Sequence, residues 1–271
     1  MPSFRIILVP LVAVLASACA LSPGEGQGEE EASTTTSALE SGLSAGELES
    51  IISPDARAAV ESMLAAEGKA ESKKGCRTKT RDPIDPNVVH VVLTNCTGRL
   101  GRHVVNGEMR VTFSQNPDGS LHAEHESVSL TIDGRPATRK ASSDITFEGS
   151  LKRVVRRGVK TGISAKGVDM TKETDEVILV DRATRCRTID GKGIATFADG
   201  RQVETTIAAL RICEDEAGND LCPTGSVTHV NAQKGKTVVQ TFDGSDVATI
   251  DTTTKKARET STWDLSCAAV P

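Results

Sequence analysis

Residues 118–134 read DGSLHAEHESVSLTIDG and indicate the fold class of this 271-residue chain. Two Asp-Gly pairs enclose the segment, and apolar side chains recur within it mostly at every second position, as in a β-strand. Asp-Gly favours the positive backbone φ angle that tight hairpin turns require. The segment therefore predicts a strand with a hairpin turn at each end.

The same turn signal recurs along the chain and predicts a mainly β protein. Asp-Gly pairs lie at 118–119, 133–134, 190–191, 199–200 and 243–244. The segments between them are rich in Val, Ile and Thr, which favour strands. We expect a large antiparallel meander of hairpins, as an open sheet or a partial barrel, with one N-terminal helix. The predicted strands are 88–94, 104–113, 120–132, 143–151, 177–189, 192–197, 201–213, 226–230, 236–242, 246–253 and 258–267.

The helix is expected within residues 47–75. Ser53 can cap its first turn, Pro54 suits the first helical position, and Asp55 favours the positive end of the helix dipole. Apolar residues then recur at helical spacing over 56–64. We expect this narrow, Ala-rich face to pack on the sheet; a helix that binds a partner is the alternative.

Four Thr-Phe pairs, each ahead of a turn glycine, form a weak internal repeat. They are Thr112-Phe113, Thr146-Phe147, Thr196-Phe197 and Thr241-Phe242. Because neighbouring side chains on a strand face opposite sides, we expect Phe in the core and Thr in solvent. A stripe of rings that binds a ligand is the alternative. With 2% aromatic residues and no Tyr, the chain has few rings for stacking against bases or sugars.

The N-terminus has the three parts of a secretory signal peptide. A short segment with Arg5 precedes an apolar run over 6–18, which is too short to span a membrane as a helix. Ala16-Ser17-Ala18 fits general signal peptidase. The stretch 15–19, Leu-Ala-Ser-Ala-Cys, resembles the lipobox of bacterial lipoproteins, although the family more often has Leu or Val in place of Ala16.

Membership in the lipoprotein class implies that Cys19 is the mature first residue and carries the lipid. In this class, an Asp directly after the lipidated Cys favours retention in the inner membrane. The residue at this position is Ala20, so the resemblance implies the outer membrane. The body also resembles uncharacterised Cys-containing β-rich envelope lipoproteins. Removing Cys19 leaves an even number of cysteines, as expected for disulfides in an oxidising compartment. The six candidates are Cys76, Cys96, Cys186, Cys213, Cys222 and Cys267.

Two disulfide pairings can be weighed from the predicted strands. Cys76–Cys96 would join the end of the helical segment to the first strand, and we favour it. Cys186–Cys213 is disfavoured, because tight hairpins at 190–191 and 199–200 would leave these cysteines about 30 Å apart at the usual strand rise.

Charge divides the chain into a tether and a body. Residues 19–50 contain seven Glu and no Asp, Lys or Arg. These Glu account for the negative net charge of the protein, because the rest of the chain is nearly neutral. We expect a signal peptide at 1–18, a lipidated, disordered tether at 19–46, a helical segment at 47–75 and a β domain at 76–271. The balanced body argues against nucleic-acid binding.

No motif identifies a catalytic residue, a metal or a cofactor. GLSAG at 42–46 matches the G-x-S-x-G elbow but lacks a preceding strand, and a capped helical turn fits better. His122 and His125 would face opposite sides of a strand and cannot share a metal. The acidic run 214–220 lacks EF-hand spacing, so a solvated turn is favoured over calcium binding. The basic run 152–160 is expected at a solvated hairpin tip, with contact to anionic lipid headgroups as the alternative.

These features favour a non-catalytic lipoprotein of the outer membrane whose β body is a scaffold for structure or partner binding. The expected partners are the membrane, through Cys19, and an envelope protein. One alternative is a carrier of a lipid or other amphiphile in a half-barrel. The other is a hydrolytic enzyme whose carboxylates no sequence spacing pairs.

Overall fold

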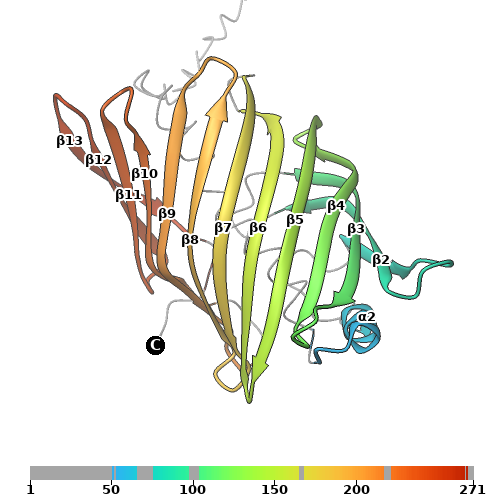
Figure 1. Cartoon of the computed structure of the whole chain (residues 1–271). Coiled ribbons are helices and arrows are strands. Elements are labelled where there is room, and N and C mark those ends of the chain that lie inside the picture. The colour runs from blue at the N-terminus through green and yellow to red at the C-terminus, as the bar shows by residue number, and fades with distance from the viewer. Residues whose placement is uncertain are drawn as a thin grey trace, which may run out of the picture.

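The fold is one sheet of 13 antiparallel strands that follow one another in chain order, with one short helix. The computed structural model describes residues 51, 53–65, 76–97, 104–164, 168–216, 221–265 and 267. The sheet is strongly curved and open, with β1 and β13 as its two edges (Figure 1). The expected antiparallel meander is confirmed, in its open form.

The strands are long in the middle of the sheet and shorter toward its edges. The helix is α2 (Ala56–Ala65). The strands are β1 (Arg77–Arg81), β2 (Val88–Thr97), β3 (Val104–Gln115), β4 (Leu121–Ile132), β5 (Arg135–Glu148), β6 (Leu151–Ile163), β7 (Asp169–Asp181), β8 (Cys186–Phe197), β9 (Gln202–Cys213), β10 (Thr224–Asn231), β11 (Lys236–Asp243), β12 (Val247–Thr253) and β13 (Arg258–Asp264).

Helix α2 begins at a different cap from the expected one. Asp55 Oδ1 accepts a hydrogen bond from the Ala58 amide at 2.8 Å, and Ser53 Oγ accepts one from the Asp55 amide at 3.2 Å. Asp55 therefore caps the first turn, and Ser53 fixes Asp55. Val60 and Met63 are fully buried, and α2 contacts β1, β2 and β3, as expected for a helix that packs on the sheet (Figure 1).

Side-chain alternation divides the sheet into an inner and an outer face. Val154, Ile178, Ile189 and Leu210 are paired in register across β6 to β9, and all four are buried on the inner face. This row forms the middle of a core that continues to both edges. The expected place of the rings is confirmed, since three Phe are buried and Phe147 packs partly buried on the core.

Four of the five Asp-Gly pairs lie at turns between consecutive strands, but Asp190-Gly191 lies inside β8. There β8 and β9 pair through a bulge, and Asp190 Oδ1 accepts a hydrogen bond from the amide of Ala209 at 2.8 Å. Ala209 has a φ of 47°, which the bulge requires. The Asp190 side chain thus stabilises a bulge, and the prediction of a hairpin at this pair was wrong.

Two of the predicted strands each combine the end of one strand with the start of the next. The segment 143–151 covers the end of β5, a turn and the start of β6, and 177–189 does the same for β7 and β8. The basic run 152–160 consequently lies within β6 rather than at a hairpin tip, which corrects that prediction. Lys152 and Arg156 are buried on its inner side, while Arg153 and Arg157 are exposed.

All six cysteines of the body form disulfides: Cys76–Cys96, Cys186–Cys213 and Cys222–Cys267. The first is the favoured pairing. The second corrects the prediction against it, because without a hairpin at 190–191 strand β8 continues and Cys186 lies directly opposite Cys213 on β9.

Replacing both partners, Cys186→Ser with Cys213→Ser, should lower the free energy of unfolding by about 3–4 kcal/mol, because this disulfide closes a separation of 27 residues in the unfolded chain. Urea unfolding at neutral pH measures the change. The unsubstituted protein, fully reduced, is the control and should lose at least as much. An unchanged urea midpoint in the double variant would show that the two sulfurs are not bonded.

Candidate functional site

The inner face buries several Lys and Arg side chains. Residues of these types are rarely buried unless they are paired. Among the residues that the structure describes, six Lys or Arg are at most 8% exposed, against a single buried carboxylate, that of Glu176. The six are Lys79, Lys152, Arg156, Lys172, Arg187 and Lys236. Sequence reasoning did not single out these six as buried, and for Lys152 and Arg156 the reason is that it placed the basic run at a solvated hairpin tip rather than within a strand.

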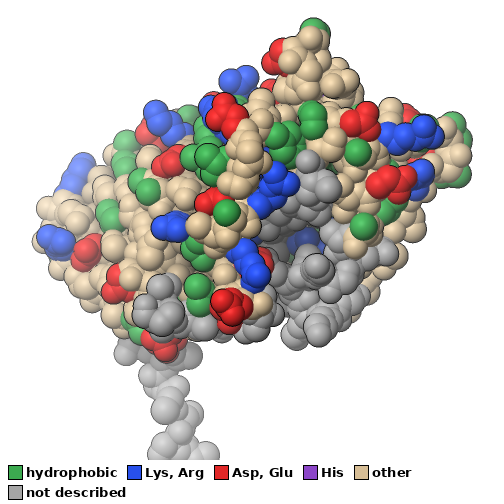
Figure 2. Space-filling view, turned by 90° about the horizontal axis from the view of Figure 1, so that it is seen from below, with side chains coloured by type: hydrophobic (Ala, Val, Ile, Leu, Met, Phe, Trp, Pro, Cys, Tyr) green, Lys and Arg blue, Asp and Glu red, His purple; other side chains and the backbone are tan. Residues whose placement is uncertain are grey.

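Four of these residues form what we name the inner basic cluster: Lys152, Arg156, Lys172 and Arg187. They come from three adjacent strands, β6, β7 and β8. Lys152 and Arg187 lie in one cross-strand row on either side of a β7 residue, and Arg156 is paired with Glu176. In the view from below, Lys and Arg side chains gather around the hollow of the molecule (Figure 2).

The chain enters this region directly before the helix. Ile51 is fully buried, and its carbonyl oxygen accepts a hydrogen bond from Lys152 Nζ at 3.3 Å. The backbone at residue 51 therefore lies on the inner face, against the inner basic cluster.

Two histidines are buried on the inner face and are held neutral. Burial is the main cause that lowers the pKa of His229 to about 3, and the charge of Lys172 adds to it. Burial also lowers the pKa of His125 to about 3, with the charges of Arg139 and His122 as smaller causes. Among the described atoms, neither ring nitrogen of His125 has a hydrogen-bond partner.

His122 lies on the opposite side of β4 from His125, as expected. Its Nδ1 is 2.7 Å from Asp144 Oδ1, and this contact lowers the pKa of Asp144. Within the described part of the chain, no group of three His, Cys, Asp or Glu is arranged to hold a metal ion.

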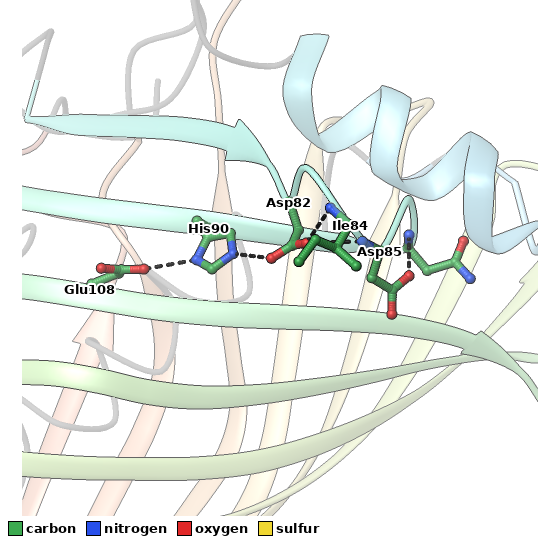
Figure 3. A network of polar contacts seen from close by, with 6 residues as sticks. Asp82, Ile84, Asp85, His90 and Glu108 are labelled. Atoms are coloured by element: carbon green, nitrogen blue, oxygen red, sulfur yellow. Dashed lines mark hydrogen bonds and ion pairs between the residues drawn. The ribbon is translucent and has the colours of Figure 1, made fainter.

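A third histidine, His90, joins two carboxylates at the edge of the sheet (Figure 3). Its Nε2 is 2.8 Å from Asp82 Oδ2, and its Nδ1 is 2.8 Å from Glu108 Oε1. The two hydrogen bonds, that from Asp82 first, raise the pKa of His90 above its usual value. Since both acceptors favour the imidazolium, the stabilisation is complete below pH 6.5 and is lost as the pH rises through the raised pKa.

Asp82 itself is fixed by its own turn. The amides of Ile84 and Asp85 donate to Asp82 Oδ1 at 2.8 and 2.9 Å (Figure 3). The hydrogen bond from the Asp85 amide is the largest cause that lowers the pKa of Asp82 to about 2, followed by that from His90. This set of contacts ties the turn before β2 to β3, and we interpret it as structural.

A groove of about 650 Å³ crosses β3 to β8 on the outer face. Two rows of side chains line it, and in one of them Val159, Glu173 and Ile194 are paired in register. Val159 and Ile194 are each 44% exposed. In the groove's other row, Arg157 is 3.8 Å from Asp175, so charges of both signs alternate with apolar side chains.

Several predicted sites lie outside the described residues: Cys19, the signal peptide and tether, and the GLSAG stretch at 42–46. The acidic run 214–220 is described only as far as Glu216. None of the helices in the described ranges is long and apolar enough to cross a membrane. No protein family, curated protein or solved structure matches this chain.

His125→Leu should make the protein less sensitive to acid. In the folded state the pKa of His125 is about 3, so only the unfolded chain binds its proton between pH 6.5 and 3. Stability is therefore lost as the pH falls through this window, by about 2–3 kcal/mol between pH 7 and 4.5 for this residue.

Urea unfolding of both proteins at pH 8, 7 and 4.5 tests this effect. The pH 8 comparison is the control, because there both states of residue 125 are uncharged and only packing differs. Equal losses of stability at pH 4.5 would contradict the assignment of His125 as a buried neutral base.

Proposed function

We propose that this protein is a non-catalytic, lipid-anchored scaffold of the bacterial envelope that binds a protein partner in the groove of its outer face. The observation that carries the proposal is the groove itself, which crosses six strands and presents exposed apolar residues between charged ones. Exposed apolar side chains rimmed by polar residues are typical of interaction surfaces.

The chemistry of the groove favours a polypeptide partner. Its four cations, Arg110, Lys140, Arg157 and Lys192, face four carboxylates, those of Glu124, Glu126, Glu173 and Asp175. A polyanion such as nucleic acid needs a positive surface, which this balanced lining does not offer. A partner that presents both charges and apolar side chains fits it best, because complementary charges give specificity while apolar contacts give affinity.

Export supports the envelope assignment. Three disulfides are typical of proteins that fold outside the cytoplasm. The lipobox-like stretch 15–19 gives a means of anchoring, since several acyl chains on one cysteine hold a protein firmly on a bilayer.

The carrier alternative ranks second. The basic inner face would suit an anionic headgroup, but much of that face is already packed. Leu121, Ile145 and Ile189 are fully buried, and Phe113 and Ile178 are 1% exposed.

Photo-crosslinking in cells of the native host tests the groove. A benzophenone amino acid at Val159 should yield a covalent adduct with a specific envelope protein. Leu179 is the matched control, because it is 43% exposed on the outer face of β7 and does not line the groove. Adducts of the same identity and yield at both positions, or none at Val159, would contradict a binding groove.

Cys19→Ser should move the mature protein from the membrane fraction to the soluble fraction, since the lipid is attached at this thiol. Ser22→Ala is the matched control and should stay with the membrane. Immunoblots of the two fractions report the distribution. If the Cys19→Ser protein remains in the membrane fraction, the anchor lies elsewhere.

A further inference from the structure

We propose that the protein forms a two-fold symmetric dimer in which the edge strand β13 pairs antiparallel with β13 of a second copy, so that two sheets join into one. The inference concerns an edge of the sheet and is independent of the outer-face groove. In the part of the chain that the structure describes, β13 pairs with β12 on one side, and its other side is an edge of the sheet (Figure 1).

Strand β13 lacks several of the features that usually protect an edge strand. Pro, Lys or a bulge on an edge strand discourages pairing with another chain. The seven residues of β13 include neither Pro nor Lys, six of them are exposed, and all pair with β12 without a bulge. The opposite edge strand, β1, has only five residues, buries Lys79 and contacts α2. The edge of β13 is therefore the better template for another strand.

Backbone hydrogen bonds decide which residues of β13 face the edge. The Leu265 amide donates to the Asp246 carbonyl at 2.7 Å, and at the other end the Ala257 carbonyl accepts from the Thr254 amide at 2.8 Å. Both ends show that odd-numbered residues face β12. Because facing alternates along an antiparallel strand, even-numbered residues direct their N–H and C=O groups to the edge. These residues are Arg258, Thr260, Thr262 and Asp264.

One register pairs the whole of β13 with its own copy. With the two-fold axis at Ser261, Arg258 lies opposite the partner's Asp264, and Thr260 lies opposite the partner's Thr262. All four residues have backbone groups toward the edge, so each pair can exchange two hydrogen bonds. A shift by one residue would oppose an edge-facing residue to one that faces β12. A shift by two would carry Arg258 or Asp264 past the end of the paired strand.

Opposite charges meet in this register. Trp263 lies opposite the buried Ala248, so the side chains of the edge-facing residues lie on the outer face. There Arg258 meets the partner's Asp264, once on each side of the two-fold axis, and opposite charges across strands are stabilising. Arg258 is already 3.4 Å from Asp251 on β12, but its side chain is 70% exposed and can accept a second carboxylate.

The surroundings of the edge are compatible with a second strand. On the inner face Ser261 meets its own copy and Glu259 meets the partner's Trp263, so no like charges are opposed. After β13 the disulfide Cys222–Cys267 holds residue 267 next to the start of β10, three strands from the edge. The described residue that follows the strand thus lies away from the edge.

Oxidative crosslinking of the full mature protein tests the pairing. Ser261→Cys places the two thiols in a non-hydrogen-bonded pair, where Cα atoms are about 4.5 Å apart and a disulfide can close. Thr262→Cys is the matched control, because it is also exposed but lies about 9 Å from its own copy, which is beyond disulfide reach. We expect about tenfold more linked dimer on non-reducing gels for Ser261→Cys. Equal yields, or no dimer at 261, would overturn the proposal.

Charge reversal tests whether the partner is a second copy. Asp264→Arg and Arg258→Asp should each weaken dimerisation about tenfold or more, because each opposes like charges on both sides of the axis. An equimolar mixture of the two variants should restore it, because only opposite charges then meet. Arg153→Asp, an exposed site on β6, is the control and should leave dimerisation unchanged.

Sedimentation equilibrium of each variant and of the mixture gives the dissociation constants. Recovery in the mixture supports the two-fold dimer. Variants that dimerise as tightly as the unsubstituted protein, or a mixture no tighter than either variant alone, would overturn it. Species that grow beyond a dimer with concentration would also overturn it, in favour of head-to-tail pairing of β13 with β1.

Discussion

Burial of one face of a single curved sheet is the constraint on which the structure depends. Side chains alternate along every strand, so a single curved sheet has one face that must be buried. In most of the sheet that face is apolar, but β6 to β8 place Lys152, Arg156, Lys172 and Arg187 on it. The middle strands therefore bury these four cations, and the carboxylate of Glu176 opposite Arg156, beside the apolar core.

The sequence was sufficient to predict the fold class, but it was insufficient to predict the register between all neighbouring strands. Turn pairs and alternating apolar residues predicted an antiparallel meander, and the structure confirms it. The hairpin predicted at Asp190-Gly191 was wrong because Asp-Gly also suits a bulge, where the carboxylate accepts a hydrogen bond from a backbone amide. That error alone moved Cys186 away from Cys213 and ended the predicted strand at 189. The basic run was misplaced for another reason: the predicted strand 143–151 continued through Gly149, whose φ of 60° makes the turn between β5 and β6.

The two faces suggest a division of roles. The inner face combines an apolar core with the inner basic cluster, and three disulfides fix pairs of segments along the meander. The outer face is left for contact, and its groove exists only because six strands align Val159, Glu173, Ile194 and their neighbours in rows. Such a surface depends on register and could not be recognised from the sequence alone.

Lysine footprinting tests most directly whether positive charge is buried in this sheet. The folded protein would be treated briefly with an amine-acylating reagent, and labelling of each lysine would be compared with that of the unfolded chain by peptide mass spectrometry. The account predicts that Lys152 and Lys172 are protected while Lys140 and Lys192 react freely. Equal labelling of all four lysines would contradict it.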